Sequence, residues 1–456
     1  MSFRIAFLPL VRATFDVPLA VESIRLARAQ LQAGGFDLLE AEQPITDLSS
    51  AQQAARQLAS NPVDLLVILQ ATFAVRSKVM TLTEASDAPI FLWAIPEPWS
   101  GERLRLNALC GINLAAHALT LRQRKYYYSY CPPDDPAVIQ KMQTLAAAGA
   151  LRRRLQSAQL GVIGDHPAGL DSCHLDEAGL RSVFGVHITR IELAEVFARA
   201  RNIADTVIDE TRAKLDFRLD NLASLEQKPL RSSLSVYNAL RQIASERKLD
   251  GLAVRCWPEF FTELGCAACG AMSLLSDGFE GSTPLPCSCE ADINGTLTQL
   301  MLQWLAKAPA FGTDMVGVDV ERNRVALWHC GLAPLAMADP NTQPHGGIHS
   351  NRRLPLVLDF PLKPGGVTLA RISQATGSLR LVVGRGEMLA EPKPFSGTAG
   401  ILKLDCPASE FLDLLMHEGL EHHISLTYGD VSLALRAFAD LIGLPILTIG
   451  KEEQLM

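Results

Sequence analysis

The chain has 456 residues, of which 48% are hydrophobic and 20% are charged, and its formal net charge is −7. This composition is typical of a globular protein with more than one core and argues against disorder. The basic runs at 121–125 and 151–155 are too short for the electrostatic footprint of nucleic-acid binding, so we expect no nucleic-acid partner. No apolar run approaches the roughly 18–20 residues that cross a bilayer, so we expect no membrane span.

The first part of the chain, residues 1–155, alternates buried strands with helical patterns. Continuously apolar runs at 3–10, 63–71 and 88–96 predict strands. The first run lies where a signal peptide would, but we expect a β-strand there instead. The spacing over 17–35 predicts a helix that ends at Gly34 and Gly35. Strands that alternate with helices predict an N-terminal α/β domain with a doubly wound parallel sheet.

The alternation restarts in residues 156–345 and changes after them. Strand patterns at 159–169 and 250–257 flank a predicted helix at 232–248, which indicates a second α/β domain with a doubly wound parallel sheet. Residues 346–456 carry alternating apolar positions with Gly and Pro punctuation, which predicts a β-rich C-terminal domain. That domain closes with a helix near 433–442 and a strand at 445–450.

Four cysteines form two close pairs with the pattern C-x2-C-x17-C-x-C, at Cys266, Cys269, Cys287 and Cys289. Two such pairs are one way to supply the four thiolates of a tetrahedral zinc site. The first pair lies among small apolar residues, where cysteine usually packs as a small hydrophobe, and this favours buried structural thiols. Ten cysteines in so long a chain do not make a disulfide scaffold, so we expect a reducing cytoplasm.

Glu290 lies in "CEADINGTL", directly before the apolar periodicity that begins at Ile293. A strand or loop therefore passes into a helix at this glutamate. A carboxylate at a helix N-terminus is stable as a simple cap or dipole partner, and this reading stands beside a catalytic one.

Further acidic and histidine residues follow at predicted strand ends. Asp314 comes after an aromatic residue and a glycine, whereas Asp319 belongs to a polar hairpin turn and is set aside. His329 ends an apolar strand directly before Cys330 and Gly331, which favours a place in a site over a place in the core. His422 and His423 are adjacent, so in a strand only one of them can point toward a site.

These residues resemble the L-fucose isomerase and L-arabinose isomerase superfamily. The resemblance lies in "CEADINGTLT", in the F-x-x-D of residues 311–314, in "LWHCGLAP" and in "HHISLTYGD" before the last helix. It implies a metal-dependent aldose–ketose isomerase, with Glu290 and Asp314 as metal ligands that also act as catalytic acid–base groups. It implies His423 as the third ligand, taken from the histidine pair of the arabinose isomerase branch, and His329 as either an extra ligand or a substrate hydrogen-bonding group. Asp430 stands where the fucose branch would have its histidine, which is a departure from that pattern.

Isomerisation needs a cation because the C2 proton of a sugar is only weakly acidic. A divalent ion that binds O1 and O2 polarises the carbonyl, and two carboxylates can then move the proton through an enediol. Oxygen ligands with one imidazole suit Mn²⁺ better than zinc, with Co²⁺ and Mg²⁺ as alternatives. The resemblance also implies a homo-oligomer, either a trimer or a hexamer.

Substrate contacts are expected at the carboxyl ends of strands. Arg255 and Trp257 lie at the C-terminal end of the predicted strand at 250–257, and Arg12 follows the first strand of the chain. The expected substrate is a fucose- or arabinose-type sugar or sulfoquinovose, because shorter relatives of the superfamily isomerise sulfoquinovose to sulfofructose. A sulfonate needs arginine at the far end of the pocket, and Arg12, Arg105 and Arg255 are the candidates. A non-catalytic sugar-binding protein and a zinc-ribbon interaction protein remain the alternatives.

Overall fold

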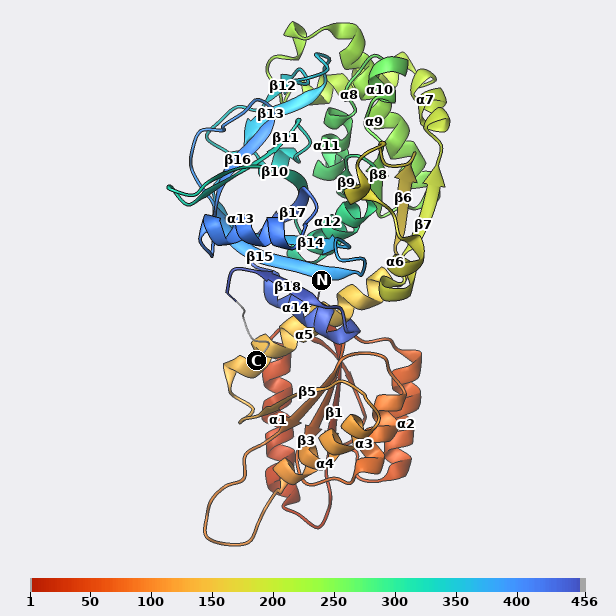
Figure 1. Ribbon diagram of the computed structural model, residues 1–456. Coiled ribbons are helices and arrows are strands. Elements are labelled where there is room, and N and C mark those ends of the chain that lie inside the picture. The colour runs from red at the N-terminus through yellow and green to blue at the C-terminus, as the bar shows by residue number, and fades with distance from the viewer. Residues whose placement is uncertain (1, 452–456) are drawn as a thin grey trace. The chain divides into compact units, whose positions relative to one another are not determined.

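The computed structural model describes residues 2–451, which divide into two compact units at residue 154 (Figure 1). The first unit is a five-stranded parallel sheet of order β2-β1-β3-β4-β5. Its strands are β1 Arg4–Leu10, β2 Asp37–Glu40, β3 Leu65–Gln70, β4 Ile90–Ala94 and β5 Tyr127–Tyr130, and its helices are α1 Val17–Ala33, α2 Leu48–Ser60, α3 Arg76–Glu84, α4 Ala108–Leu121 and α5 Pro136–Leu155. The predicted doubly wound sheet is confirmed, and α1 ends at Gly34 as expected.

The second unit begins with a four-stranded parallel sheet of order β7-β6-β8-β9. Its strands are β6 Gln159–Ile163, β7 His187–Ile191, β8 Gly251–Val254 and β9 Cys287–Ser288. Its helices are α6 Glu177–Phe184, α7 Leu193–Arg201, α8 Asp205–Leu215, α9 Gln227–Arg247, α10 Glu259–Glu263, α11 Cys269–Asp277 and α12 Ile293–Ala306. Helix α12 starts at Ile293, where the apolar periodicity begins, so the strand-to-helix passage at Glu290 is confirmed.

The rest of the second unit is a nine-stranded sheet that closes on itself. Its strands are β10 Phe311–Asp319, β11 Arg324–His329, β12 His345–Gly347, β13 Val357–Pro361, β14 Gly365–Ser373, β15 Arg380–Met388, β16 Thr398–Leu404, β17 His423–Tyr428 and β18 Ile446–Ile449, with helices α13 Ala408–His417 and α14 Ser432–Ile442. Strand β15 also pairs with β16, so β16-β11-β10-β17-β14-β15 form a closed six-stranded barrel. The β-rich C-terminal domain is therefore confirmed, and β10 and β11 pair with its strands although they precede residue 346.

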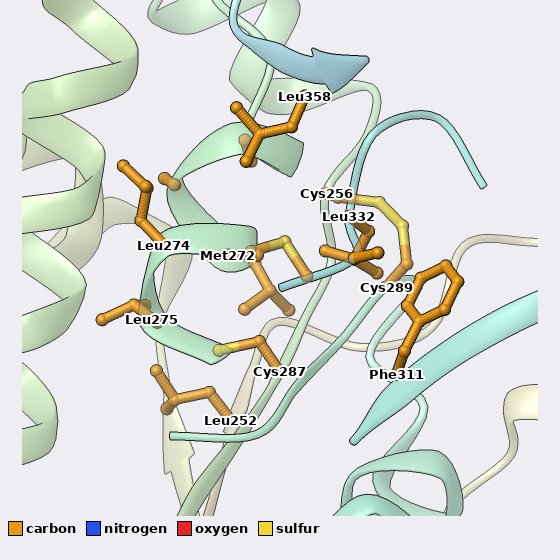
Figure 2. Close-up of a cluster of buried hydrophobic side chains, with 14 of the residues drawn as sticks. Leu252, Cys256, Met272, Leu274, Leu275, Cys287, Cys289, Phe311, Leu332 and Leu358 are labelled. Carbon is orange, nitrogen blue, oxygen red and sulfur yellow. A yellow bond between two sulfur atoms is a disulfide. The ribbon is translucent and has the colours of Figure 1, made fainter. Parts of the chain in front are cut away.

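One hydrophobic core joins the parallel sheet and the barrel within the second unit. Figure 2 shows Leu252 of β8 and Met272 of α11 in the same buried cluster as Phe311 of β10 and Leu358 of β13. Each of these four side chains is 1% exposed or less. This shared core fixes the end of β8 and the start of α12 against the barrel strands, and the candidate site lies where they meet.

Candidate active site

Glu290 lies in a short loop between β9 and α12 whose backbone is held at several points. The amide of Ala291 donates to the Val254 carbonyl at the end of β8 (3.1 Å), and the amide of Asp292 donates to the Cys289 carbonyl (3.0 Å). Glu290 and Ala291 both adopt left-handed backbone conformations, with φ of 60° and 56°. Such conformations are uncommon outside glycine and occur often at functional sites. This loop presents the Glu290 side chain to the barrel.

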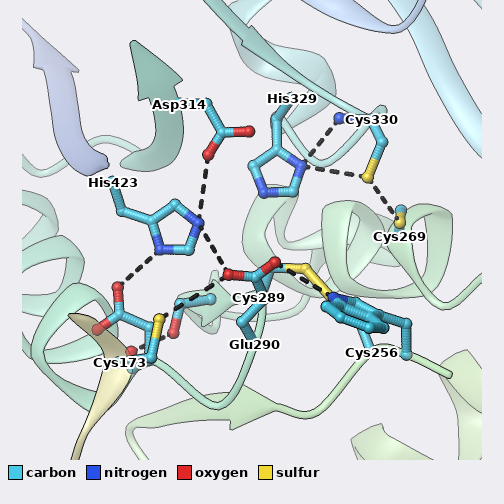
Figure 3. The surroundings of a disulfide bond; sticks show 12 residues. Cys173, Cys256, Cys269, Cys289, Glu290, Asp314, His329, Cys330 and His423 are labelled. Atoms are coloured by element: carbon cyan, nitrogen blue, oxygen red, sulfur yellow. Dashed lines mark hydrogen bonds and ion pairs between the residues drawn. A yellow bond between two sulfur atoms is a disulfide. The ribbon is translucent and has the colours of Figure 1, made fainter. Parts of the chain in front are cut away.

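The barrel brings Asp314 and His423 together through strand register. In the antiparallel pair β10–β17, Asp314 is directly opposite His423. Residues directly opposite in such a pair share one face of the sheet, with Cβ atoms about 5 Å apart. The His423 Nε2 atom lies 3.3 Å from Asp314 Oδ1 and 3.8 Å from Glu290 Oε2 (Figure 3). The three predicted metal-ligating residues are therefore close together in space.

The other ring nitrogen of His423 is held by a buried carboxylate that the sequence analysis did not single out. His423 Nδ1 donates to Asp292 Oδ2 at 2.9 Å, and Asp292 is 1% exposed. Asp292 also forms an ion pair with Arg371 and caps α12 through the Gly295 amide. In the sequence, Asp292 could have been recognised only as a helix N-cap, two residues after Glu290 in "CEAD".

This arrangement suits a divalent cation. Because Nδ1–H is donated to Asp292, Nε2 of His423 is the ring nitrogen that a bound cation would take, and it lies within 4 Å of two carboxylate oxygens. Asp314 Oδ1 is buried and accepts no hydrogen bond from residues 2–451. Neighbouring ligands of an octahedral ion with bonds of about 2.1 Å are about 3 Å apart, which is close to the separations here. A cation bound between Glu290, Asp314 and His423 would offset the repulsion between the two carboxylates. The oxygen-rich donor set fits Mn²⁺ or Mg²⁺.

His422 also reaches Glu290, which corrects the expectation that only one of the adjacent histidines points toward the site. Its Nε2 lies 3.2 Å from Glu290 Oε2, and its ring centroid lies 4.0 Å from that of His423. Strand β17 begins at His423, so His422 precedes the regular alternation that the expectation assumed. Ser172 holds His422 Nδ1 at 3.1 Å. The ligand atoms of Asp314, His422 and His423 lie within 4.8 Å of one another, so His422 is a further candidate ligand.

The local fields keep Glu290 ionised. Burial alone would raise the pKa of Glu290, but hydrogen bonds from His422 and Trp257 and the charge of His423 hold the pKa below its usual value. The hydrogen bond with Glu290 in turn raises the pKa of His422. Burial raises the pKa of Cys173, whose Sγ lies 3.9 Å from Glu290 Oε2, so this thiol stays protonated there.

The predicted substrate-contacting residues differ in their placement. Trp257 Nε1 donates to Glu290 Oε1 at 3.2 Å, and the buried His329 ring lies 6.0 Å from that of His423. His329 Nδ1 accepts the Cys330 amide at 2.9 Å, which leaves its Nε2 as the donor in the neutral ring. Arg255 is committed to an ion pair with Glu259 at 2.7 Å. Arg12 belongs to the first unit, where its guanidinium lies over Phe73.

The cysteines do not form a zinc ribbon. Within residues 2–451, the groups able to hold a metal contain only Cys269 of the four, together with Cys330 and His349. Cys266 and Cys287 are buried free thiols, as expected. The expectation of a thiol was wrong for Cys289, which forms a disulfide with Cys256. The pairing is possible because the end of β8 and the Glu290 loop bring the two Cα atoms to 5.8 Å.

Two family models match the chain. Residues 6–155 match "Fucose/sulfoquinovose isomerase, N-terminal domain" and residues 360–449 match "L-fucose isomerase, C-terminal domain". A sulfoquinovose isomerase from Alkalicoccus urumqiensis is 32% identical over 450 residues, which cover 98% of this chain and 99% of that protein. Those from Priestia aryabhattai (31%) and Clostridium sp. strain MSTE9 (29%) cover 94% and 83% of this chain and 95% and 85% of their own lengths.

Fold, site and relatives together define an enzyme of the sugar aldose–ketose isomerase class. The chain belongs to the fucose/sulfoquinovose isomerase family. Among solved structures, a solute-binding protein from Agrobacterium vitis bound with alpha-D-tagatopyranose covers 57% of this chain and 78% of its own, at 15% identity and a TM-score of 0.18. This TM-score is too low to indicate a shared fold. None of the helices in residues 2–451 is both long and apolar enough to span a bilayer.

Proposed function

We propose that the chain is a Mn²⁺-dependent isomerase that converts sulfoquinovose to sulfofructose through an enediol. One observation carries this proposal: Glu290 and Asp314 both lie within 4 Å of the same nitrogen of His423, whose other nitrogen is held by Asp292. Relatives named sulfoquinovose isomerase, which match nearly the whole chain, support the choice of substrate.

Glu290, Asp314 and His423 would hold the ion, with His422 as a fourth candidate. When bound, a divalent cation supplies charge that polarises the sugar carbonyl and lowers the barrier to removal of the C2 proton. Co²⁺ and Mg²⁺ are the alternatives to Mn²⁺ for this donor set.

The chain's own residues perform the proton transfer. Glu290 is ionised at neutral pH and has both oxygens oriented, one by Trp257 and the other by His422. One of the two carboxylates, Glu290 or Asp314, takes the proton from C2 as O1 gains a proton, which gives the enediol; O2 then loses its proton as a carboxylate delivers a proton to C1, which gives the ketose. His329 offers an Nε2–H for a substrate oxygen, and its burial lowers its pKa, so it remains a neutral donor. A positioned acid–base pair contributes about 10²–10⁴-fold to such a step.

A panel of aldoses tests the proposal. The protein is incubated in deuterated buffer with Mn²⁺ and either sulfoquinovose, L-fucose, D-arabinose, L-arabinose or a neutral deoxy-hexose. We expect sulfofructose with deuterium at C1. Ketose formation without deuterium would indicate a hydride shift and contradict the enediol. Turnover of neutral sugars with no turnover of sulfoquinovose would contradict the substrate.

We also propose that the chain works in the cytoplasm as a homo-oligomer, a trimer or a hexamer, as its resemblance to the superfamily implies. Sedimentation velocity measures this assembly directly. A monomer at micromolar concentration would contradict it.

A further inference from the structure

Arg352 lies beside the site and has a free positive charge. Its guanidinium carbon is 5.7 Å from the centre of the Trp257 ring and 5.9 Å from that of Phe261, both within cation–π range. No carboxylate within residues 2–451 forms an ion pair with it. The same indole donates its N–H to Glu290. Trp257 therefore contacts the carboxylate with its edge and the arginine with its face.

Two other arginines near the site are already neutralised. Arg255 is paired with Glu259 at 2.7 Å, and Arg371 is buried against Asp292 and Glu421. An anionic substrate group would have to break these pairs, and breaking a buried pair leaves an uncompensated charge. Arg352 can bind an anionic group without breaking an ion pair.

The backbone of Arg352 is held by a tight loop before any ligand binds. The His349 amide donates to the Leu354 carbonyl (3.0 Å), and the Arg353 amide donates to the His349 carbonyl (2.8 Å). His349 Nδ1 also accepts the Arg352 amide at 3.3 Å. Burial, with the charges of His329 and Arg352, lowers the pKa of His349 to about 4, so at neutral pH the cation of this loop is an arginine rather than His349. A preorganised loop reduces the entropy that binding must offset.

The opposite side of the site offers an anion no arginine or lysine. A cavity of about 680 Å³ beside His422 is lined by Asp171 and Asp176, by Glu421, which is already paired with Arg371, and by polar groups such as His174, Ser172 and Gln374. Hydroxyl groups suit that lining, whereas a sulfonate does not. The charge distribution therefore directs an anionic end of the substrate toward Arg352.

We propose that Arg352, stacked on Trp257, binds the sulfonate of the sugar and makes the enzyme prefer a C6-sulfonated hexose over a neutral one. This inference rests on the proposed function. A sugar whose C1–C2 end lies at Glu290 can extend along the indole of Trp257, which contacts Glu290 with its edge and Arg352 with its face. The planar guanidinium can offer two parallel N–H donors to the sulfonate oxygens, as it does to phosphate.

The experiment compares Arg352→Gln and Arg352→Lys with Arg353→Gln, an exposed arginine of the same loop, as the matched control. We measure kcat/KM for sulfoquinovose and for D-glucose with Mn²⁺, and dissociation constants of both sugars by calorimetry. For Arg352→Gln we expect sulfoquinovose kcat/KM and affinity to fall about 10–100-fold, the range of a hydrogen bond to a charged group, with D-glucose changed less than about threefold. Lysine should restore part of the loss, and Arg353→Gln should match the wild type.

The outcomes separate this inference from the proposed function. An equal loss for both sugars, or no loss for sulfoquinovose, would overturn the role of Arg352 while leaving the isomerase intact. A wild-type protein that isomerises neither sugar would overturn the proposed function. In that case sulfoquinovose binding that weakens in Arg352→Gln still supports the arginine, and absent or unchanged binding overturns it. Near-UV circular dichroism of each variant verifies that it is folded.

Discussion

His423 is constrained at both of its ring nitrogens, and this defines the chemistry of the site at the scale of single residues. Asp292 accepts the Nδ1–H, which leaves Nε2 as the nitrogen that faces Glu290 and Asp314 and could bind a cation with them. Carboxylate–histidine pairs of this kind orient metal ligands and raise their basicity. Burial would raise the pKa of Asp292, but the charges of Arg371 and His423 hold it far below its usual value. Asp292 is therefore an acceptor at every pH at which the protein works.

Replacing Asp292 by Asn is expected to weaken Mn²⁺ binding about 10–100-fold, because the amide no longer enforces the Nδ1–H form of His423. Electron paramagnetic resonance titration of free Mn²⁺ measures the affinity, and ¹⁵N spectra of the histidines report which ring nitrogen carries the proton. Asp319→Asn, at the exposed last residue of β10, is the matched control. Wild-type affinity in Asp292→Asn would refute the positioning role.

The Glu290–His422 pair predicts a pH dependence for the metal-free protein. The pKa of His422 is raised by its hydrogen bond with Glu290, so that contribution to stability is complete below the usual histidine pKa of 6.5 and is lost as pH rises through the higher pKa of the folded protein. The pKa of Glu290 is lowered, because the hydrogen bonds outweigh burial. Its contribution is therefore complete above 4.5 and is lost as pH falls through the lower folded value.

Urea unfolding in EDTA between pH 5 and 9 measures this dependence as a free energy of unfolding. His422→Ala should remove the decline on the alkaline side, whereas His117→Ala, an exposed histidine of α4, should keep it. An identical alkaline decline in His422→Ala and wild type would show that the pair does not cause it.

At the scale of elements, the site depends on one irregular loop and one strand register. The sequence predicted the loop, because the apolar pattern of α12 begins three residues after Glu290. It did not predict that Asp314 pairs with His423, since nothing local in the sequence sets the pairing of strands so distant in the chain. Asp292 was missed for a different reason: an N-cap carboxylate looks the same in sequence whether or not it also holds a histidine. Arg352 was missed because its partners are aromatic faces supplied by another element.

The left-handed backbone of the loop between β9 and α12 predicts which substitutions the loop tolerates. A β-branched side chain at Ala291 should cost about 1–3 kcal/mol, because φ is 56° there and the residue is buried. Ala291→Val should therefore lower both stability, measured by urea unfolding, and isomerase activity, because Glu290 shifts with it. Ala291→Gly tolerates positive φ and should change stability by less than about 1 kcal/mol. Full activity and stability in the valine variant would contradict the assigned backbone.

At the scale of the whole molecule, the two units each have a core of their own. The two parallel sheets were predictable from alternating strands and helices, whereas closure of the barrel was not, because β15–β16 pairing completes a ring that no local pattern encodes. The boundary near residue 345 between the predicted second and third domains stays a prediction.

A substitution at Gly149 should lower the stability of the first unit alone. A Cβ at this position of α5 would lie 1.9 Å from the Asp64 carbonyl oxygen, so Gly149→Ala must move the helix, at a cost of about 1–3 kcal/mol. Calorimetry should show a transition lowered by roughly 2–10 °C, with the Mn²⁺ affinity of the second unit unchanged. Gly366→Ala, where a Cβ meets no atom within 4 Å, is the control. A lowered Mn²⁺ affinity in Gly149→Ala would show that the units are coupled.

The central claim is that Glu290, Asp314 and His423 hold one divalent cation. Mn²⁺ titration monitored by electron paramagnetic resonance, on the wild type and on Glu290→Gln, Asp314→Asn and His423→Ala, tests it most directly. We predict one tight Mn²⁺ per chain in the wild type and a loss of at least about 10-fold in affinity in each variant. Wild-type affinity in all three variants, or no Mn²⁺ bound by the wild type, would contradict the account.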